Sequence, residues 1–304
     1  MRTAVVLFNL GAPDHPEAVK PFLFNLFYDK YIIRLPNPLR YGLAKLIASR
    51  REKEAQKIYA TLGGGSPLLK NTQTQAQALE AALGQEYKTF IAMRYWHPFI
   101  GEAVEAVKNN DPDRIVLLPL YPQYSTTTTQ SSFLTWREES KVKGLDKITK
   151  EICCYPIFEA FIDQIVAQIQ DFWENIDLSK TRFLFSAHGL PEKIIKAGDP
   201  YQYQVEQSVQ EILKKLPKKI DYRICYQSRV GPLKWIEPST ENEIVQAGLD
   251  QKNIVVIPIS FVSEHAETLV ELDQVYREHA MKNGIKKYDR LLTVDSQPIF
   301  IEGL

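Results

Sequence analysis

Short apolar runs separated by stretches of helical periodicity make up most of the chain. These runs are rich in Val, Ile, Leu and Phe and do not alternate strictly with polar residues, which is typical of strands buried on both faces of a parallel sheet. They predict strands at 3–9, 89–94, 114–119 and 147–152 in the first half, and at 182–187, 222–226, 253–259 and 290–294 in the second.

Helices are predicted between those strands. Segment 74–83 has apolar residues at helical spacing and is followed by Gly84, a helix stop signal. The same periodicity recurs at 161–173 and 205–216. Alternating strands and helices predict an α/β fold with right-handed crossovers. A chain of 304 residues suits two domains, and we expect them at 1–150 and 151–304.

The two halves echo each other where strands end. Segment 7–13 resembles 184–191, and 115–119 resembles 254–258, each an apolar run leading into a Gly/Pro turn. One explanation is two similar lobes related by a pseudo-twofold axis, and the other is that parallel strands commonly end this way. In both cases, the loops after the carboxyl ends of the strands are where an open α/β sheet binds its ligand.

Residues 20–60 do not follow the alternation of short apolar runs and helical segments. A bulky apolar stretch at 22–33 precedes Leu39, Leu43, Leu46 and Ile47, which lie at helical spacing among Lys and Arg residues. We expect an amphipathic basic helix, with most of these apolar residues in the core and an exposed subset that lines the ligand's entrance or contacts a membrane surface.

Composition narrows the classes of partner and location. Lys plus Arg and Asp plus Glu are both 37, so the basic excess of a nucleic-acid-binding protein is missing. No apolar run suits a signal peptide or approaches the ~18 residues of a membrane span. We therefore expect a cytoplasmic protein that makes at most weak peripheral contact with the inner membrane face.

The cysteines are Cys153, Cys154 and Cys225. Their odd number and the lack of a Cys-x-x-Cys motif argue against a disulfide framework and against a four-cysteine iron–sulfur cluster within one chain. Buried thiols are the expected state.

His188 is the first candidate for chemistry. It follows an apolar strand and precedes a glycine, which places it at the mouth of an α/β crevice rather than on a core face. Imidazole can accept a proton near neutral pH or bind a borderline metal.

Segment 261–273 is the second candidate. If it is helical, Glu264, Glu267 and Glu271 share one face, and carboxylates clustered with His265 suit a hard-to-borderline divalent metal. Acidic residues in a first turn also complement the helix dipole. That alternative accounts for Glu264 and Glu267 but leaves Glu271 and the histidine unexplained.

Aromatic and arginine residues gather in three segments past strands, 93–98, 121–129 and 226–235. Together they indicate a flat ligand that carries carboxylates, although each segment alone could be ordinary core. The glycine-rich turn at 63–67 is not a Gly-x-Gly-x-x-Gly motif after a strand, so a dinucleotide fingerprint is lacking.

Eight segments, taken in order, resemble the ferrochelatase family along nearly the whole chain. They lie at 10–13 (LGAP), 63–67 (GGGSP), 93–98 (MRYWHP), 119–129, 186–191 (SAHGLP), 198–201 (GDPY), 227–235 and 261–273. The resemblance implies two lobes of chelatase-like, Rossmann-type topology, each a four-stranded parallel sheet flanked by helices, with a porphyrin cleft between them. It also implies a lyase that inserts Fe2+ into protoporphyrin IX to give protoheme, the last step of heme biosynthesis.

The resemblance also implies roles for individual residues. It implies that His188 is the active-site histidine, that Glu267 is its carboxylate partner, and that Glu271 continues an acidic line, so that these three handle the metal. The residues expected to bind porphyrin are Leu10, Arg94, Tyr95, Tyr124, Ser125, Trp235 and His265.

Three departures refine these expectations. Val275 stands where some members extend the acidic line by a further turn. No cysteine follows Cys225, so we expect no iron–sulfur cluster and no cofactor beyond the substrate Fe2+. Leu10 stands where coproporphyrin-using relatives tend to have tyrosine, which favours protoporphyrin IX. We expect a monomer.

The alternatives are a chelatase for another tetrapyrrole or metal, such as coproporphyrin III or cobalt, and a tetrapyrrole-binding or metal-delivery protein without turnover. A nicotinamide enzyme is a more distant one.

Overall fold

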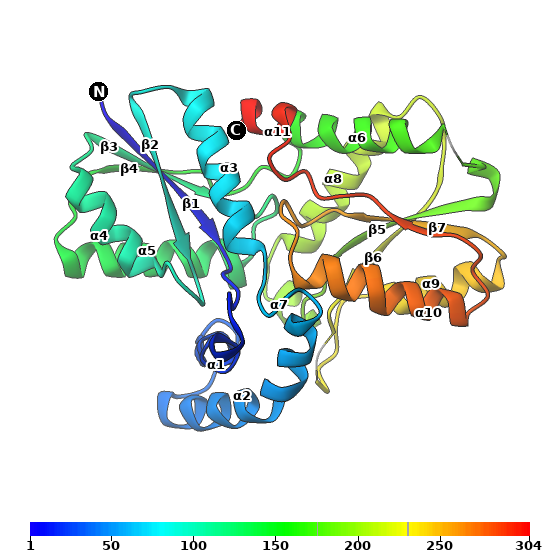
Figure 1. The fold of residues 1–304 in the computed structure, drawn as a ribbon, viewed down its shortest axis with the longest axis horizontal. Coiled ribbons are helices and arrows are strands. Elements are labelled where there is room, and N and C mark those ends of the chain that lie inside the picture. Colours follow the sequence, from blue (N-terminus) through cyan, green and yellow to red (C-terminus); the bar gives the residue numbers. More distant parts are fainter. Residues whose placement is uncertain (175, 230) are drawn as a thin grey trace. The chain divides into compact units, whose positions relative to one another are not determined.

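The computed structural model describes residues 1–174, 176–229 and 231–304. Val230, inside the motif at 227–235, lies outside the described residues. The chain divides into two compact units, Met1–Cys154 and Tyr155–Leu304. Each unit contains one parallel sheet with helices on both faces (Figure 1).

Unit 1 has the strand order β2-β1-β3-β4, and every neighbouring pair is parallel. The predicted strand starts and ends are correct to within two residues. The strands are β1 (Thr3–Asn9), β2 (Tyr87–Met93), β3 (Arg114–Pro119) and β4 (Ile148–Glu151). The helices are α1 (Val19–Tyr28), α2 (Asn37–Ala60), α3 (Leu68–Leu83), α4 (Ile100–Asn110) and α5 (Ser131–Lys143).

The core of unit 1 follows from the alternation of side chains along β1. Ala4, Val6 and Phe8 pack against apolar residues of α4 and α5 on one face of the sheet. On the other face, Asn9 donates a hydrogen bond to Thr72 of α3. A strand covered on both sides needs apolar residues at nearly every position, which is the pattern read from the sequence.

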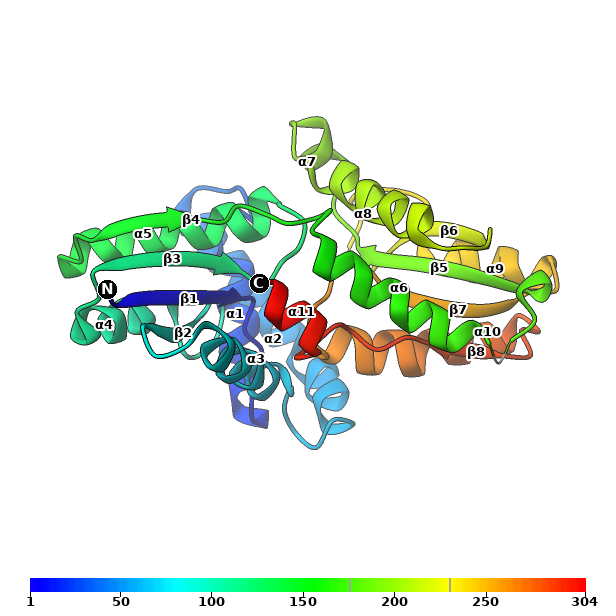
Figure 2. The same cartoon turned by 90° about the horizontal axis from the view of Figure 1, so that it is seen from above.

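Unit 2 repeats this architecture with the order β6-β5-β7-β8, again all parallel. Helices α6 and α8 cover one face and α9 and α10 the other (Figures 1 and 2). The strands are β5 (Thr181–His188), β6 (Asp221–Gln227), β7 (Asn253–Pro258) and β8 (Tyr288–Arg290). The helices are α6 (Glu159–Trp173), α7 (Glu192–Lys196), α8 (Tyr201–Lys215), α9 (Thr240–Leu249), α10 (Arg277–Lys282) and α11 (Pro298–Gly303).

The strand predicted at 290–294 is wrong beyond its first residue. Strand β8 ends at Arg290. The backbone N–H of Leu291 still donates to the carbonyl of Val256, and the chain then leaves the sheet. The apolar residues after Arg290 are therefore not part of a strand.

The two units repeat the pairing register of their strands as well as the sequence motif at the strand ends. Phe8 and Ser186 pair with the prolines that end β3 and β7, respectively. Two residues further on, Leu10 and His188 therefore occupy corresponding positions in their own units.

The helix expected within residues 20–60 forms, and part of its apolar set is exposed as expected, but the expectation that most of these apolar residues lie in the core is wrong. Of the segment's bulky apolar and aromatic residues, Phe22, Leu23 and Tyr59 are buried. Helix α2 instead buries Ala44 and Ala48, while Leu39 and Leu46 are 64% and 46% exposed. Residues seven apart share a helix face, so the leucine stripe lies opposite the alanines. Close packing through two small residues leaves the leucines outside.

Candidate active site

His188 ends one strand of unit 2, and Glu267 lies in the helix that follows the neighbouring strand. His188 is the last residue of β5, and its backbone N–H donates to the Ser260 hydroxyl over 3.0 Å. Glu267 begins a π-helix, Glu267–Tyr276, that follows β7. Because β5 and β7 are adjacent and parallel, their carboxyl ends meet at one edge of the sheet.

The two side chains form one hydrogen-bonded pair. Nδ1 of His188 lies 2.8 Å from Oε2 of Glu267. An ionised carboxylate can only accept, so Nδ1 carries the proton and Nε2 is the nitrogen left for other chemistry. Nε2 of His265 is 3.8 Å from the same Glu267 oxygen, while its Nδ1 lies 3.0 Å from the carbonyl oxygen of Ser263.

The pair shifts both pKa values in favour of the charged forms. Burial works against the imidazolium of His188, but the charge and hydrogen bond of Glu267, helped by Glu271, raise its pKa above the ordinary value. Burial also opposes ionisation of Glu267, yet His188 and His265 hold the pKa of that carboxyl far below its usual range. The side chains of His188 and Glu267 are 38% and 27% exposed, so a ligand can reach them.

Glu271 is fixed in place by hydrogen bonds from three residues to which the sequence assigned no role of their own. Its carboxylate accepts from the backbone N–H of Ser228 (2.9 Å), from the Ser228 hydroxyl (2.5 Å), from Nε2 of Gln227 (3.2 Å) and from the hydroxyl of Tyr276 (2.9 Å). Burial and the negative charge of Glu267 raise its pKa. Glu271 therefore ionises less readily than its neighbour.

The sequence contained a signal for two of these partners but not for the third. Gln227 and Ser228 open a motif that follows a predicted strand, so their closeness to the site could have been found. Tyr276 could not, because its bond to a carboxylate five residues earlier depends on the wide turn of a π-helix.

Glu264 does not join the acidic face that its spacing predicted. It precedes the helix and accepts from Nη1 of Arg290 (2.9 Å) and from the backbone of Thr293 (2.8 Å). Burial opposes its charge, but Arg290 and the hydrogen bonds lower the pKa of this carboxyl. Glu264 is therefore half of a buried ion pair that ties the start of the helix to β8.

Trp235 lies against Gly189, the residue that follows His188. It is buried, and a Cβ on Gly189 would come within 3.3 Å of its ring and 2.8 Å of the Gln227 carbonyl oxygen. Only glycine fits after His188, because backbone and ring occupy that space.

Arg94 and Tyr95, in unit 1, share a buried carboxylate that sequence reasoning missed. Nη2 of Arg94 is 2.8 Å from Oδ2 of Asp29, and Nε donates to the Ser131 hydroxyl over 2.8 Å. The Tyr95 hydroxyl donates to the same Asp29 oxygen over 2.7 Å, and its side chain is almost fully buried. Tyr95 therefore supports the arginine rather than presenting a ring to a ligand.

The other predicted porphyrin-binding residues of unit 1 follow strands β1 and β3. Leu10 and Tyr124 are partly exposed. Ser125 is buried, and its hydroxyl caps a second π-helix, Thr126–Gln130, by accepting from the N–H of Thr127.

The ferrochelatase family model matches residues 2–304. The chain belongs to the ferrochelatase family. It is 52% identical to the ferrochelatase of Caulobacter vibrioides strain NA1000 over 309 residues, which cover 100% of this chain and 88% of that protein. It is 52% identical to the ferrochelatase of Wolbachia strain wRi from Drosophila simulans over 310 residues, covering 100% and 98%.

Solved structures agree with this family fold. Bacillus subtilis SirB with Fe3+ gives a TM-score of 0.59 at 11% identity, covering 100% of this chain and 92% of that one. CbiX, described as the terminal enzyme of siroheme biosynthesis in denitrifying bacteria, gives 0.52 at 12% identity, covering 100% and 97%. At such identities, the likeness supports the chelatase-like fold alone.

Among the described residues, no group of three His, Cys, Asp or Glu side chains is arranged to hold a metal ion. For a ferrochelatase the metal is a substrate, and a site that releases it need not be a closed cage of ligands.

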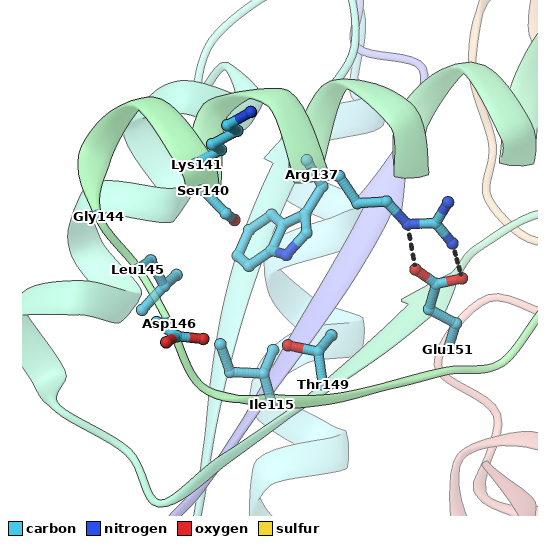
Figure 3. Close-up of a pocket in the computed structure, with 10 residues that line it drawn as sticks. Ile115, Arg137, Ser140, Lys141, Gly144, Leu145, Asp146, Thr149 and Glu151 are labelled. Carbon is cyan, nitrogen blue, oxygen red and sulfur yellow. Dashed lines mark hydrogen bonds and ion pairs between the residues drawn. The ribbon is translucent and has the colours of Figure 1, made fainter.

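The described hollows of unit 1 are not sites of this chemistry. One of about 550 Å³ lies between α5 and β4, where Arg137 and Glu151 form a two-bond ion pair (Figure 3). Another of about 660 Å³ runs along β2. Neither is lined by a residue to which the family resemblance assigns a role in metal handling or porphyrin binding.

Proposed function

We propose that this chain inserts Fe2+ into protoporphyrin IX to give protoheme, the last step of heme biosynthesis. Membership of the ferrochelatase family supports the reaction, and the hydrogen bond between His188 and Glu267 is the observation that supports assigning the reaction to these residues. In the reaction one Fe2+ enters the macrocycle and two pyrrole protons leave, so the enzyme must accept protons close to the metal's destination.

His188 is proposed as the first proton acceptor. Its Nδ1–H is held by Glu267, so the neutral ring presents the lone pair of Nε2. The partly exposed side chain can reach a pyrrole N–H once the macrocycle is bent. Remote contacts with the porphyrin can supply several kcal/mol towards that bending.

Glu267 and Glu271 are proposed to handle Fe2+ and the released protons together with His188. Carboxylate and imidazole suit a borderline divalent ion, and the deeply lowered pKa of Glu267 keeps it anionic. Glu271 has a raised pKa and fixed hydrogen-bond partners, so it is suited to exchange a proton with its surroundings.

Leu10, Arg94, Tyr95, Tyr124, Ser125, Trp235 and His265 are proposed to form or support the porphyrin site. Arg94 keeps only part of its hydrogen-bonding capacity for a porphyrin carboxylate, since Asp29 and Ser131 occupy two of its nitrogens. Leu10 has no hydroxyl with which to meet an additional polar substituent, which supports protoporphyrin IX over coproporphyrin III.

No helix among the described residues is both long and apolar enough to cross a membrane. We propose a cytoplasmic monomer without a resident cofactor or iron–sulfur cluster. Weak contact with the inner membrane face would use an apolar–basic patch, which we define as the exposed residues Ile32, Leu35, Leu39, Leu46, Arg34, Lys45 and Arg50.

The test is an anaerobic absorbance assay that mixes the protein with Fe2+ and either protoporphyrin IX or coproporphyrin III. We expect the metalloporphyrin spectrum with catalytic amounts of protein and a higher kcat/KM for protoporphyrin IX. Binding without turnover would support a carrier instead, and preference for coproporphyrin III would overturn the assignment based on Leu10.

A further inference from the structure

Cys153 and Cys154 form a pair of adjacent thiols in the connector between β4 and α6. Their sulfur atoms lie 3.3 Å apart, Cys153 is exposed and Cys154 is partly exposed. The expectation of buried thiols therefore holds for Cys225 and is wrong for Cys153. The pair ends unit 1, and the next residue, Tyr155, begins unit 2.

The connector is anchored on both sides of the pair. On one side, the backbone N–H of Ile152 donates to the carbonyl of Leu117 over 2.9 Å. On the other, the ring of Tyr155 is buried against Phe161 and Phe300, with ring centroids 6.4 Å apart in both contacts. The two sulfur atoms thus belong to a short segment whose ends are held.

Adjacent cysteines are poorly suited to a disulfide between themselves. Their Cα atoms are about 3.8 Å apart across a trans peptide, below the roughly 4.4 Å at which disulfide geometry begins. Such a bond would be strained and readily reduced. A larger atom that bonds to both sulfurs does not require them to approach to the ~2.05 Å of an S–S bond.

We propose that Cys153 and Cys154 form a vicinal dithiol site that chelates one soft, thiophilic centre, separate from the His188–Glu267 pair. Thiolates favour soft metal ions over the hard and borderline ions that carboxylates and imidazole take. A trivalent arsenical and a soft divalent cation share the chemistry that this site requires.

The bonds balance without an oxidant. With phenylarsine oxide, two S–H bonds and the As–O bonding break, two As–S bonds form, and the oxygen leaves with both protons as water. With Cd2+, two Cd–S bonds form and two protons are released to solvent, as expected when thiols become metal ligands.

Cys225 provides an internal comparison. It is fully buried in β6, and burial raises the pKa of its thiol to about 12. Its reactive thiolate form is therefore scarce at neutral pH. The structure predicts that Cys225 does not take part.

The experiment titrates the reduced full-length protein with phenylarsine oxide and, separately, with Cd2+. We expect one phenylarsenic group per chain, with the loss of two titratable thiols and attachment to the peptide that contains Cys153 and Cys154. C153S and C154S should each bind roughly 100-fold more weakly, because the second bond no longer forms at high effective concentration. C225A should bind like the wild type.

Wild-type affinity in C153S or C154S, or attachment at Cys225, would overturn the proposal. Circular dichroism and metallation rates of C153S and C154S, both expected to match the wild type, exclude loss of binding through misfolding. If C225A does not fold, peptide mapping of the modified wild-type protein decides the same point. Binding of the arsenical without Cd2+ identifies a metalloid-selective site, and binding of both identifies a general soft-ion site.

Discussion

His188, at the end of β5, lies 2.8 Å from Glu267, in the π-helix that follows the adjacent parallel strand β7, and this contact raises the pKa of the imidazole while lowering that of the carboxyl. The contact therefore orients the imidazole ring and also shifts its pKa. Losing either partner should affect the reaction in a different way.

His188→Ala should abolish metal insertion while leaving the fold intact. Removing a positioned general base typically costs roughly 10²–10⁴-fold in rate, and no other described imidazole occupies this position. The measurement is kcat in the anaerobic assay together with the thermal unfolding midpoint. His97→Ala is the matched control, because His97 also pairs with a carboxylate, Glu102, at 2.8 Å, but in an exposed part of unit 1. Near-normal turnover of His188→Ala would exclude it as the essential base.

The pH dependence of kcat/KM should report the raised pKa of His188. The ring must be neutral to accept a proton, and its ordinary pKa is about 6.5. Since Glu267 raises that pKa, activity should increase with pH through a midpoint above 6.5. Glu267→Gln removes the negative charge and leaves the burial that disfavours the imidazolium, so the residual activity should have its midpoint at lower pH. An unchanged midpoint in this variant would mean that another group controls the profile.

Glu267→Gln should reduce kcat more than Glu271→Gln. Glu267 touches His188, whereas Glu271 bonds to Ser228 and Tyr276 and acts on the histidine only through its charge. The test compares kcat of both variants at saturating porphyrin and Fe2+. The reverse order would place the reacting centre nearer to Glu271 than the contacts indicate.

The sheets were predictable from the sequence because strands covered on both faces are mostly apolar, as the central residues of β1 and β5 are. The position of His188 was predictable for a related reason, since it follows such a strand directly. Glu264 was wrongly predicted to share the acidic helix face, because the prediction assumed helical spacing for residues that precede the helix. Its actual partner, Arg290, is 26 residues away in sequence, and no local sequence pattern indicates that the two side chains pair.

Helix α2 shows a second limit. Its leucines have the spacing of a packing face, yet the helix packs through Ala44 and Ala48. Small residues permit the closest approach between helices. The spacing of apolar positions does not show which face of the helix packs against its neighbours. Asp29 was also missed, because its role is to bind Arg94 and Tyr95, which are distant in sequence.

The apolar–basic patch should bind anionic vesicles weakly. Leu39→Ser combined with Leu46→Ser should reduce co-sedimentation with phosphatidylglycerol-containing vesicles at low salt, because both side chains are exposed and carry apolar area into the interface. Leu249→Ser is the control, since Leu249 is an exposed leucine of unit 2 far along the sequence from the patch. Failure of the wild type to co-sediment would count against the proposed membrane contact.

Metal choice follows from the atoms that the site offers. Nε2 of His188 and the carboxylates of Glu267 and Glu271 include no thiolate, and such a set has little intrinsic preference for Fe2+ over its neighbours in the first transition row. Affinities of nitrogen and oxygen sites generally rise from Fe2+ to Co2+, and Zn2+ also binds well. We therefore expect purified protein to insert Zn2+ and Co2+ as well as Fe2+ at equal free concentrations. Soft ions that dissociate slowly should inhibit, and C153S and C154S separate inhibition at the dithiol from inhibition at His188. Strict rejection of both Zn2+ and Co2+ would require a geometric constraint beyond these ligands, because ligand chemistry alone does not exclude them.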